Sequence, residues 1–257
     1  MSDFSKVINK LRLVFPEINQ LDIKKIFENS KTVKRYLKNK RRSRIVDSVI
    51  KLCNFPPKIT LKLPKNKERE HVATVVFDMR SSQKILENLK PKEFYDFINK
   101  FITSSKTLLF SEKYNGIYDK FTGDGFIVHF SKRISGNDFI QKAVLYSSEI
   151  VSKSLSLFNQ ISNKMVLNYI NIMGLSAGVD YGEVTWFRNG AEISVIGKSI
   201  VMASRLVSCA KQNEILVNNL VHQKINPNRF NFKKKPIKPK GYKDPFIVFK
   251  LKRINPK

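Results

Sequence analysis

The sequence predicts an α+β fold: a ferredoxin-like or palm-type mixed sheet with flanking helices, preceded by a small N-terminal helical segment. From residue 71 onward, short strand-like runs alternate with longer runs of helical periodicity. Their order, β-α-β-β-α-β with additions, is that of a ferredoxin-like sheet. The composition agrees, because 42% of the 257 residues are hydrophobic and 19 are Phe, which supports a substantial core.

Two units are expected, a basic N-terminal helical segment with its linker at residues 1–65 and the α+β domain at residues 66–257. Apolar residues recur at helix-like spacing between Val7 and Ile26. The pair Pro56-Pro57 stops the helical pattern, and a polar, charged connector follows it. The first unit is suited to a regulatory or dimerisation role, but its residues identify no activity.

The α+β domain is expected to alternate strands and helices along its length. Pro91 favours a helix start, and Asn189-Gly190 is a strong two-residue hairpin signal. The expected strands lie at 72–77, 169–179, 182–187, 192–196, 214–218 and 246–251, with a hairpin at 114–130. The expected helices lie at 84–110, 138–161 and 200–210.

Positive charge is concentrated at the two ends of the chain. Residues 1–70 carry 19 Lys and Arg against 7 Asp and Glu, and residues 223–257 carry 12 against 1. A basic flank can bind nucleic acid or an anionic surface, but it can equally be a solvated face. The flanks lack clustered aromatic stacking platforms, so a nucleic-acid partner is not favoured.

No sequence feature indicates a membrane or an oxidising compartment. No apolar run approaches the roughly 18 residues needed to span a bilayer, and the N-terminal MSDFSKVINK lacks a signal-peptide core. Cys53 and Cys209 are far apart and suggest neither a disulfide framework nor a metal cluster. We therefore expect a soluble, reduced, cytoplasmic protein without a transmembrane segment.

Two aspartates stand at the ends of strands. A short buried-type strand, VATVVF, ends in Asp78, and Asp124 sits between two glycines at the bend of YDKFTGDGFIVHF. Each alone could be a turn residue. Together they suit a two-metal phosphoryl-transfer site, since Mg²⁺ takes one or two carboxylates and completes its shell from water and substrate phosphates. His129, in contrast, is expected to be structural.

Five segments in order resemble the motifs of the class III nucleotidyl cyclases. They are VVFDMRSS at 75–82, KFTGDGFIVHF at 120–130, SAGVDYGEV at 176–184, VIGKSIVMASRLVSCAKQNEILVN at 195–218 and the Lys-Gly strand KGYKDPFIVFKL at 240–251. The match covers about residues 72–251. The resemblance implies a catalytic domain at 66–257 that converts a nucleoside triphosphate into a 3′,5′-cyclic monophosphate and pyrophosphate.

The resemblance also implies two divalent cations, Mg²⁺ or Mn²⁺, bound at Asp78, Met79 and Asp124. These ions would polarise the 3′-hydroxyl and neutralise charge on the α-phosphate and the leaving group. Arg205 matches the family arginine that stabilises the transition-state α-phosphate, and its planar fork suits that charge. Asp78, Asp124 and Arg205 are therefore the expected catalytic set.

Two further cations are candidate phosphate contacts. The backbone from Met79 to Ser82 would cradle the triphosphate, with Arg80 as an extra ligand, although a surface ion pair is an alternative role for Arg80. Lys240, in the Lys-Gly motif, resembles a phosphate-contacting lysine. Because the family builds its sites between subunits, one supplying the aspartates and the other the arginine, the resemblance implies a homodimer with two symmetric sites.

The base pocket departs from the common pattern of the family. Lys120 matches the lysine that contacts the base in adenylate cyclases. Ser194 stands where an aspartate normally accepts from the adenine amino group, and Val201 stands at the position of a ribose-orienting asparagine. A hydroxyl is a poorer acceptor for an amine than a carboxylate, which weakens the case for ATP. A lysine ammonium only donates, which fits O4 of uracil better than the 4-amino group of cytosine.

A compact cyclase with an altered base pocket is similar to the pyrimidine cyclases of Pycsar-type antiphage defence. In those, infection triggers synthesis of cUMP or cCMP, and the messenger activates a cell-killing effector. We therefore expect conversion of UTP to cUMP, with ATP and CTP as alternative substrates. Two other classes stay open, a pseudocyclase that binds nucleotide without turnover and a palm-like protein that binds nucleic acid.

Overall fold

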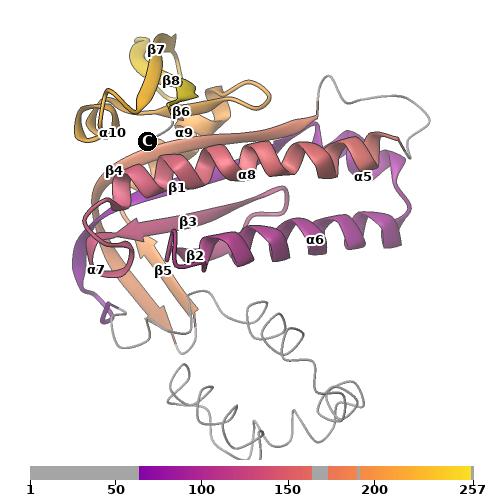
Figure 1. Ribbon diagram of the computed structural model, residues 1–257, viewed down its shortest axis with the longest axis horizontal. Coiled ribbons are helices and arrows are strands. Elements are labelled where there is room, and N and C mark those ends of the chain that lie inside the picture. Colours follow the sequence, from indigo (N-terminus) through magenta and orange to yellow (C-terminus); the bar gives the residue numbers. More distant parts are fainter. Residues whose placement is uncertain (1–63, 164–172, 190–191, 256–257) are drawn as a thin grey trace, which may run out of the picture.

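The computed structural model describes residues 64–163, 173–189 and 192–255. Their fold confirms the α+β class, with an eight-stranded mixed sheet and helices packed on it (Figure 1). The expected N-terminal helical segment lies almost entirely at residues 1–63, outside the described residues. In the part of the chain that the structure describes, no helix combines the length and apolarity needed to cross a membrane.

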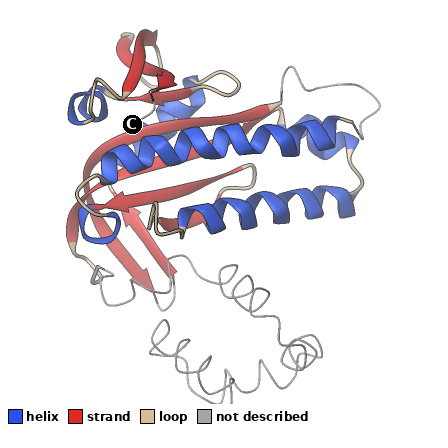
Figure 2. Ribbon diagram, viewed as in Figure 1, coloured by secondary structure: helices blue, strands red, loops and turns tan. Residues whose placement is uncertain are grey.

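The sheet is built around two long central strands, β1 and β4 (Figure 2). β1 pairs antiparallel with β3 and β4, β4 pairs in parallel with β6, and β5 branches off by pairing with β4. The order across the sheet is β2-β3-β1-β4-β6-β8-β7. The strands are β1 (Arg69–Arg80), β2 (Ile117–Phe121), β3 (Gly125–Ser131), β4 (Gly174–Asn189), β5 (Glu192–Ile196), β6 (Ile215–Val217), β7 (Phe230–Ile237) and β8 (Phe246–Ile254).

Helices cover both faces of the sheet. The two longest, α6 and α8, lie side by side over one face, and α9 packs on the other (Figure 1). The helices in the described residues are α5 (Ser82–Asn88), α6 (Pro91–Leu109), α7 (Lys132–Ser135), α8 (Phe139–Ser162), α9 (Lys198–Cys209) and α10 (Asn219–Lys224).

Alternate residues of β1 divide between these two layers. Phe77 belongs to the main core beneath α6 and α8, where it stacks on Phe126. Val76 instead packs against Val207 of α9. Because side chains alternate across a strand, Asp78 lies on the same face as Val76, toward α9. The hydrophobic pattern of β1 therefore decides which face of the sheet carries this carboxylate.

The long helix expected at 84–110 is wrong in one respect, because the structure divides it into α5 and α6. Lys90, between them, takes an extended conformation with ψ 147°. A residue that precedes proline is driven out of the helical region by the proline ring, and Pro91 then starts α6. The helix start at Pro91 is therefore confirmed, and the continuity across it is not.

Two strand expectations also need correction. Within the described residues, the strands expected at 169–179 and 182–187 form one continuous strand, β4, since Gly182 stays paired with Val72 of β1; residues 169–172 lie outside the described residues. β7, in the basic C-terminal flank, was not expected, because its central lysines mask the strand pattern. As an edge strand that pairs with β8, it keeps Lys233 and Lys234 exposed to solvent, while Lys235 forms an ion pair with Glu214. The hairpin of β4 with β5 is confirmed, with Phe187 opposite Ser194.

Candidate active site

The register of β1 and β3 brings the two predicted aspartates together. Asp78 is paired with Gly125, the residue after Asp124, and the Met79 N–H donates to the Asp124 carbonyl over 2.8 Å. The side chain of Asp124 accepts a hydrogen bond from Ser82 Oγ at 3.0 Å. The end of β1 and the β2–β3 turn therefore form one carboxylate-bearing corner on the α9 face of the sheet.

The two glycines that flank Asp124 have different roles in this corner. Gly123 has a φ of +98°, a conformation that side-chain-bearing residues rarely adopt. A Cβ on Gly125 would lie 1.9 Å from the Phe77 carbonyl oxygen, so only glycine permits this close approach of β3 to β1. The Gly-Asp-Gly pattern is thus needed to place the Asp124 backbone against the end of β1.

The electrostatics of this corner fit a divalent cation. Burial raises the pKa of the Asp78 carboxyl; the Arg80 guanidinium opposes this rise, and the charge of Asp124 adds to it. A cation beside Asp78 would oppose this rise in pKa and stabilise the charged carboxylate. No group of three or more His, Cys, Asp or Glu side chains within the described ranges is arranged to hold a metal. Two carboxylates suffice for Mg²⁺ when phosphates and water complete its shell.

Arg80 bridges three elements around this corner. Its guanidinium forms an ion pair with Asp78 at 3.0 Å and donates through Nε to Ser176 Oγ of β4 at 3.1 Å. It also donates to the Val207 carbonyl near the end of α9. With these three contacts Arg80 ties β1 to β4 and α9, and its role as a phosphate ligand stays a prediction.

The other predicted cations are not engaged in this way. Arg205 lies half-buried on α9, Lys120 is exposed on β2, and Lys240 is exposed in the loop between β7 and β8. None of the three forms an ion pair with another of the described residues. Val201, at the asparagine position, is 56% exposed on α9. These side chains remain available to a ligand or to a second chain.

Ser194 has a partner that sequence reasoning missed. The β4–β5 hairpin returns to β2, and Ser194 Oγ donates to Asp119 Oδ2 at 2.9 Å. A β-bulge shifts the register of β2 between Tyr118 and Lys120, so simple alternation does not say which face Asp119 occupies. The only sequence signal for Asp119 was its position directly before Lys120.

Exposed apolar side chains gather on the elements that surround these residues. Phe187 on β4 is 47% exposed and Ile196 at the end of β5 is 68% exposed. With Val201 on α9, they lie outside the cores formed by the described residues. Apolar surface of this kind is typical of protein–protein contacts.

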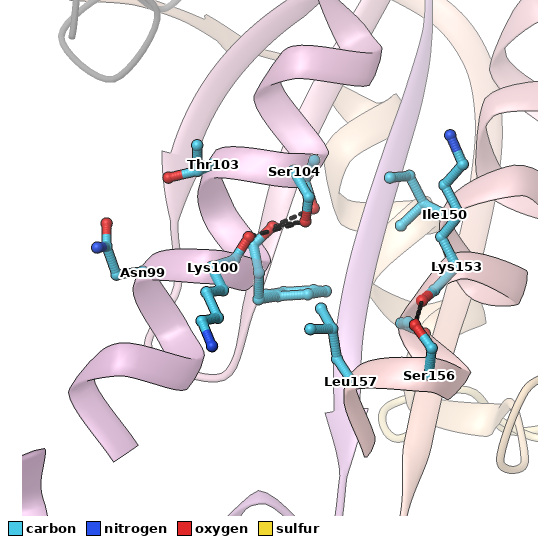
Figure 3. Close-up of a pocket in the computed structure, with 11 residues that line it drawn as sticks. Asn99, Lys100, Thr103, Ser104, Ile150, Lys153, Ser156 and Leu157 are labelled. Carbon is cyan, nitrogen blue, oxygen red and sulfur yellow. Dashed lines mark hydrogen bonds between the residues drawn. The ribbon is translucent and has the colours of Figure 1, made fainter. Parts of the chain in front are cut away.

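A separate pocket of about 570 Å³ lies between α6 and α8 (Figure 3). Phe101, Ile150 and Leu157 contribute its apolar part, and Lys100 and Lys153 lie on its two sides. The pocket belongs to the helical layer on the far side of the sheet from α9, and it includes none of the predicted site residues.

Comparison with known proteins identifies the architecture. The chain resembles the adenylyl cyclase CyaB from P. aeruginosa, with 20% identity and a TM-score of 0.65 over 73% of this chain and 96% of that one. The guanylyl cyclase Cya2 has 20% sequence identity and a TM-score of 0.64, with 74% of this chain and 96% of that chain covered. The guanylate cyclase domain of RhGC from Catenaria anguillulae, in complex with GTP, has 16% sequence identity and a TM-score of 0.59, with 73% of this chain and 100% of that chain covered. No curated protein matches the chain in sequence.

These structural neighbours share the fold but differ in their nucleotide, so the fold does not decide the base. The family model described as the adenylate and guanylate cyclase catalytic domain matches residues 65–253. Apart from the last residue of β8, that match spans the whole sheet, both carboxylates of the corner and the helix α9. The resemblance found in the sequence motifs is confirmed at this level: the chain belongs to the family of adenylate and guanylate cyclase catalytic domains.

Proposed function

We propose that this nucleotidyl cyclase domain converts UTP into cUMP and pyrophosphate with two divalent cations, and that it does so as a homodimer. The observation that carries the proposal is the placement of Asp78 and Asp124 at one corner of a cyclase fold, where Asp78 pairs with Gly125 and the Met79 N–H donates to the Asp124 carbonyl. The charge of Asp124 adds to the rise in the pKa of Asp78, and a cation beside Asp78 would oppose that rise.

The proposed reaction needs few protein groups. Asp78 and Asp124, with the Met79 backbone, would hold Mg²⁺ or Mn²⁺, which would activate the 3′-hydroxyl and neutralise phosphate charge. The 3′-oxygen bonds to the α-phosphorus, the bond to the bridging oxygen breaks, and pyrophosphate leaves. Arg205 would stabilise charge on the α-phosphate, and Lys240 and Arg80 would contact phosphate.

The proposed dimer is supported by an arginine without an ion-pair partner and by exposed apolar side chains near it. Arg205 has no acidic partner among the described residues, and it shares α9 with the exposed Val201. Phe187 and Ile196 extend that apolar surface onto the β4–β5 hairpin. A symmetric contact through these elements would let each chain supply Arg205 to the carboxylates of its partner.

The proposed base is uracil. Lys120 is exposed and only donates, which suits a carbonyl oxygen, while Ser194 replaces the carboxylate expected in an adenine pocket. ATP and CTP are the alternative substrates. In the proposed role, cUMP is a messenger of cytoplasmic antiphage defence that activates a separate effector, and residues 1–65 form an appendage to the catalytic unit at 66–257.

The test is to incubate the purified protein with Mn²⁺ and, separately, ATP, GTP, CTP and UTP, and to resolve the products by mass. We expect cUMP as the dominant product and its loss by at least about a hundredfold in Asp124→Ala. Dominant cAMP or cCMP would replace the uracil assignment by an alternative. Absence of every cyclic product, with nucleotide binding retained, would favour the pseudocyclase. Full activity in Asp124→Ala would overturn the metal assignment.

A further inference from the structure

A chain of five hydrogen-bonded side chains runs through the side of the domain that carries Ser194. Ser194 Oγ and His129 Nε2 both lie 2.9 Å from Asp119 Oδ2. On the far side of the imidazole ring, Nδ1 lies 3.2 Å from Thr74 Oγ1, which lies 3.2 Å from Ser199 Oγ. The five residues come from β5, β2, β3, β1 and α9, so the chain joins segments that are remote in sequence.

Most of this chain is sealed from water. His129 and Thr74 are fully buried, Ser199 is 1% exposed, and Asp119 is 5% exposed. The rings of His129 and Trp186 pack nearly perpendicular to each other, with ring centroids 5.9 Å apart. Only Ser194, at the β5 end, is half-buried. One end of the chain therefore reaches the surface at Ser194, which contacts Asp119, the neighbour of Lys120 on β2.

The chemistry of the groups fixes the direction of the hydrogen bonds around Asp119. A carboxylate only accepts, so both the Ser194 hydroxyl and the Nε2–H of His129 donate to it. The hydroxyl proton of Ser194 is therefore engaged in the hydrogen bond to Asp119. Any further hydrogen bond at Ser194 Oγ must be one in which the oxygen accepts.

This arrangement changes what Ser194 offers to a ligand. A hydroxyl that donates to a buried carboxylate is polarised, and its oxygen becomes a stronger acceptor than that of a free serine. In the common family pattern, an aspartate at the position of Ser194 would carry a negative charge. Here Asp119, which accepts the hydrogen bond from Ser194, supplies that charge instead. His129 holds that carboxylate in place from the opposite side.

We propose that Asp119 and His129 are positioning residues that select the nucleobase by turning Ser194 into an obligate acceptor for a base N–H. This inference rests on the proposed function, because it takes Ser194 and Lys120 as the base contacts. Uracil offers O4 to the Lys120 ammonium and N3–H to Ser194. The substrate class is therefore a nucleoside triphosphate whose base carries a ring N–H donor beside a carbonyl oxygen, as uracil does.

The test compares UTP with N3-methyl-UTP, which keeps both carbonyl oxygens and lacks the N3–H. In the wild type, kcat/KM for UTP should exceed that for N3-methyl-UTP by about tenfold or more, the size expected for one hydrogen bond to a polarised acceptor. Asp119→Asn keeps the bulk at the site and removes the charge, so it separates polarity from steric exclusion of the methyl group. Asp119→Asn should raise KM for UTP about tenfold and leave kcat within about threefold. The ratio of kcat/KM for UTP to kcat/KM for N3-methyl-UTP should become smaller than in the wild type.

Ser194→Ala and the double variant complete a cycle. If Asp119 acts through Ser194, the double variant should be no worse than Ser194→Ala alone; additive losses would overturn the inference. Ser147→Ala removes a buried hydroxyl that bonds only within α8, and it should leave both KM and the ratio unchanged. A purely structural role of Asp119 predicts a lower melting temperature in Asp119→Asn with unchanged KM and ratio, which would also overturn the inference.

Two further measurements keep the inference testable if a variant or the reaction fails. His129→Gln retains an N–H donor toward Asp119 and should keep the nucleotide preference, whereas His129→Leu should lose it. Dissociation constants measured with Ca²⁺ in place of Mn²⁺ give the same comparison without turnover. If the wild type forms no cyclic product but Asp119→Asn weakens nucleotide binding, the cyclase proposal alone is refuted. If the wild type is active and the variants keep its KM and its preference for UTP over N3-methyl-UTP, this inference alone is refuted. Should the reaction use ATP or CTP, analogues that lack the exocyclic amino group replace N3-methyl-UTP.

Discussion

Buried carboxyl groups in this domain differ in whether a cation reaches them. Asp180 on β4 is 5% exposed, and burial raises the pKa of its carboxyl to about 7, although a backbone hydrogen bond at Tyr181 opposes the rise. The Asn218 side chain, which is neutral, donates to its Oδ1. Burial also acts to raise the pKa of Glu214, which is 4% exposed, but hydrogen bonds from Lys235 and Lys250 lower it to about 2. Glu214 therefore stabilises the junction of β6, β7 and β8 as an ion-paired group, while Asp180 is costly when charged.

This cost gives a prediction for Asp180→Asn. Because the folded-state pKa of Asp180 is raised, the folded chain binds a proton more tightly than the unfolded chain between about pH 4 and pH 7. The stabilising contribution of the protonated group is present at acid pH and is lost as the pH rises toward 7. We expect the wild type to lose about 2 kcal/mol more of its free energy of unfolding than Asp180→Asn between pH 5 and pH 8. Urea unfolding at both pH values measures this difference, and equal pH dependence in the two proteins would contradict it.

The contact between α9 and β4 is the element-scale feature that positions the site. A Cβ on Gly178 would lie 2.2 Å from the Ala203 carbonyl oxygen and 2.6 Å from the Val207 amide nitrogen, both in the backbone of α9. The helix thus rests directly on the strand. Since α9 carries Arg205 and its Val207 carbonyl receives Arg80, this contact couples the packing of one helix to the carboxylate corner.

Gly178→Ala is therefore expected to displace α9. The free energy of unfolding should fall by about 3 kcal/mol, since backbone atoms cannot move aside as a flexible side chain would. Gly182→Ala, four residues along the same strand, is the matched control. Its Cβ would meet the Ser199 Cβ at 3.5 Å, an ordinary contact, and should cost less than about 1 kcal/mol. Denaturant melts of the two variants compare these values, and similar losses would show that α9 tolerates the shift.

At the scale of the whole molecule, the proposed site has two halves that stand on separate elements of the chain, the carboxylate corner and α9. Asp78 and Asp124 share one corner of the sheet, while Arg205 and Val201 lie on α9 and Phe187 and Ile196 extend the apolar surface. Two chains related by a twofold axis would bring each half opposite the other, which is why the dimer belongs to the proposed mechanism.

Mixing two inactive variants tests this arrangement. Asp124→Ala and Arg205→Ala chains are expected to be inactive alone. When they are co-expressed, half of the dimers should be mixed, and each mixed dimer should contain one intact site, giving about a quarter of wild-type activity. Product formation by the purified mixture is the measurement, and size-exclusion chromatography verifies that both variants still dimerise. No recovery in a verified mixed dimer would place both residues in one chain's site.

Features that depend on local pattern could be predicted from the amino-acid sequence. Alternating apolar residues specified the α+β class, Pro91 marked the start of α6, and the glycines around Asp124 marked its hairpin. The order of the motifs identified the family, because each motif is a short contiguous segment. These properties follow from neighbouring residues alone, and no contact between distant segments is needed to recognise them.

The tertiary structure alone decided what depends on register and on long-range contacts. The β-bulge before Lys120 and the return of β5 to β2 place Asp119 behind Ser194, and no alternation rule foretells either. The three partners of Arg80 come from β1, β4 and α9, so its engagement appears only after the sheet and the helix have assembled. Such contacts join residues dozens of positions apart, and the balance of their packing and hydrogen bonding is set by the whole fold.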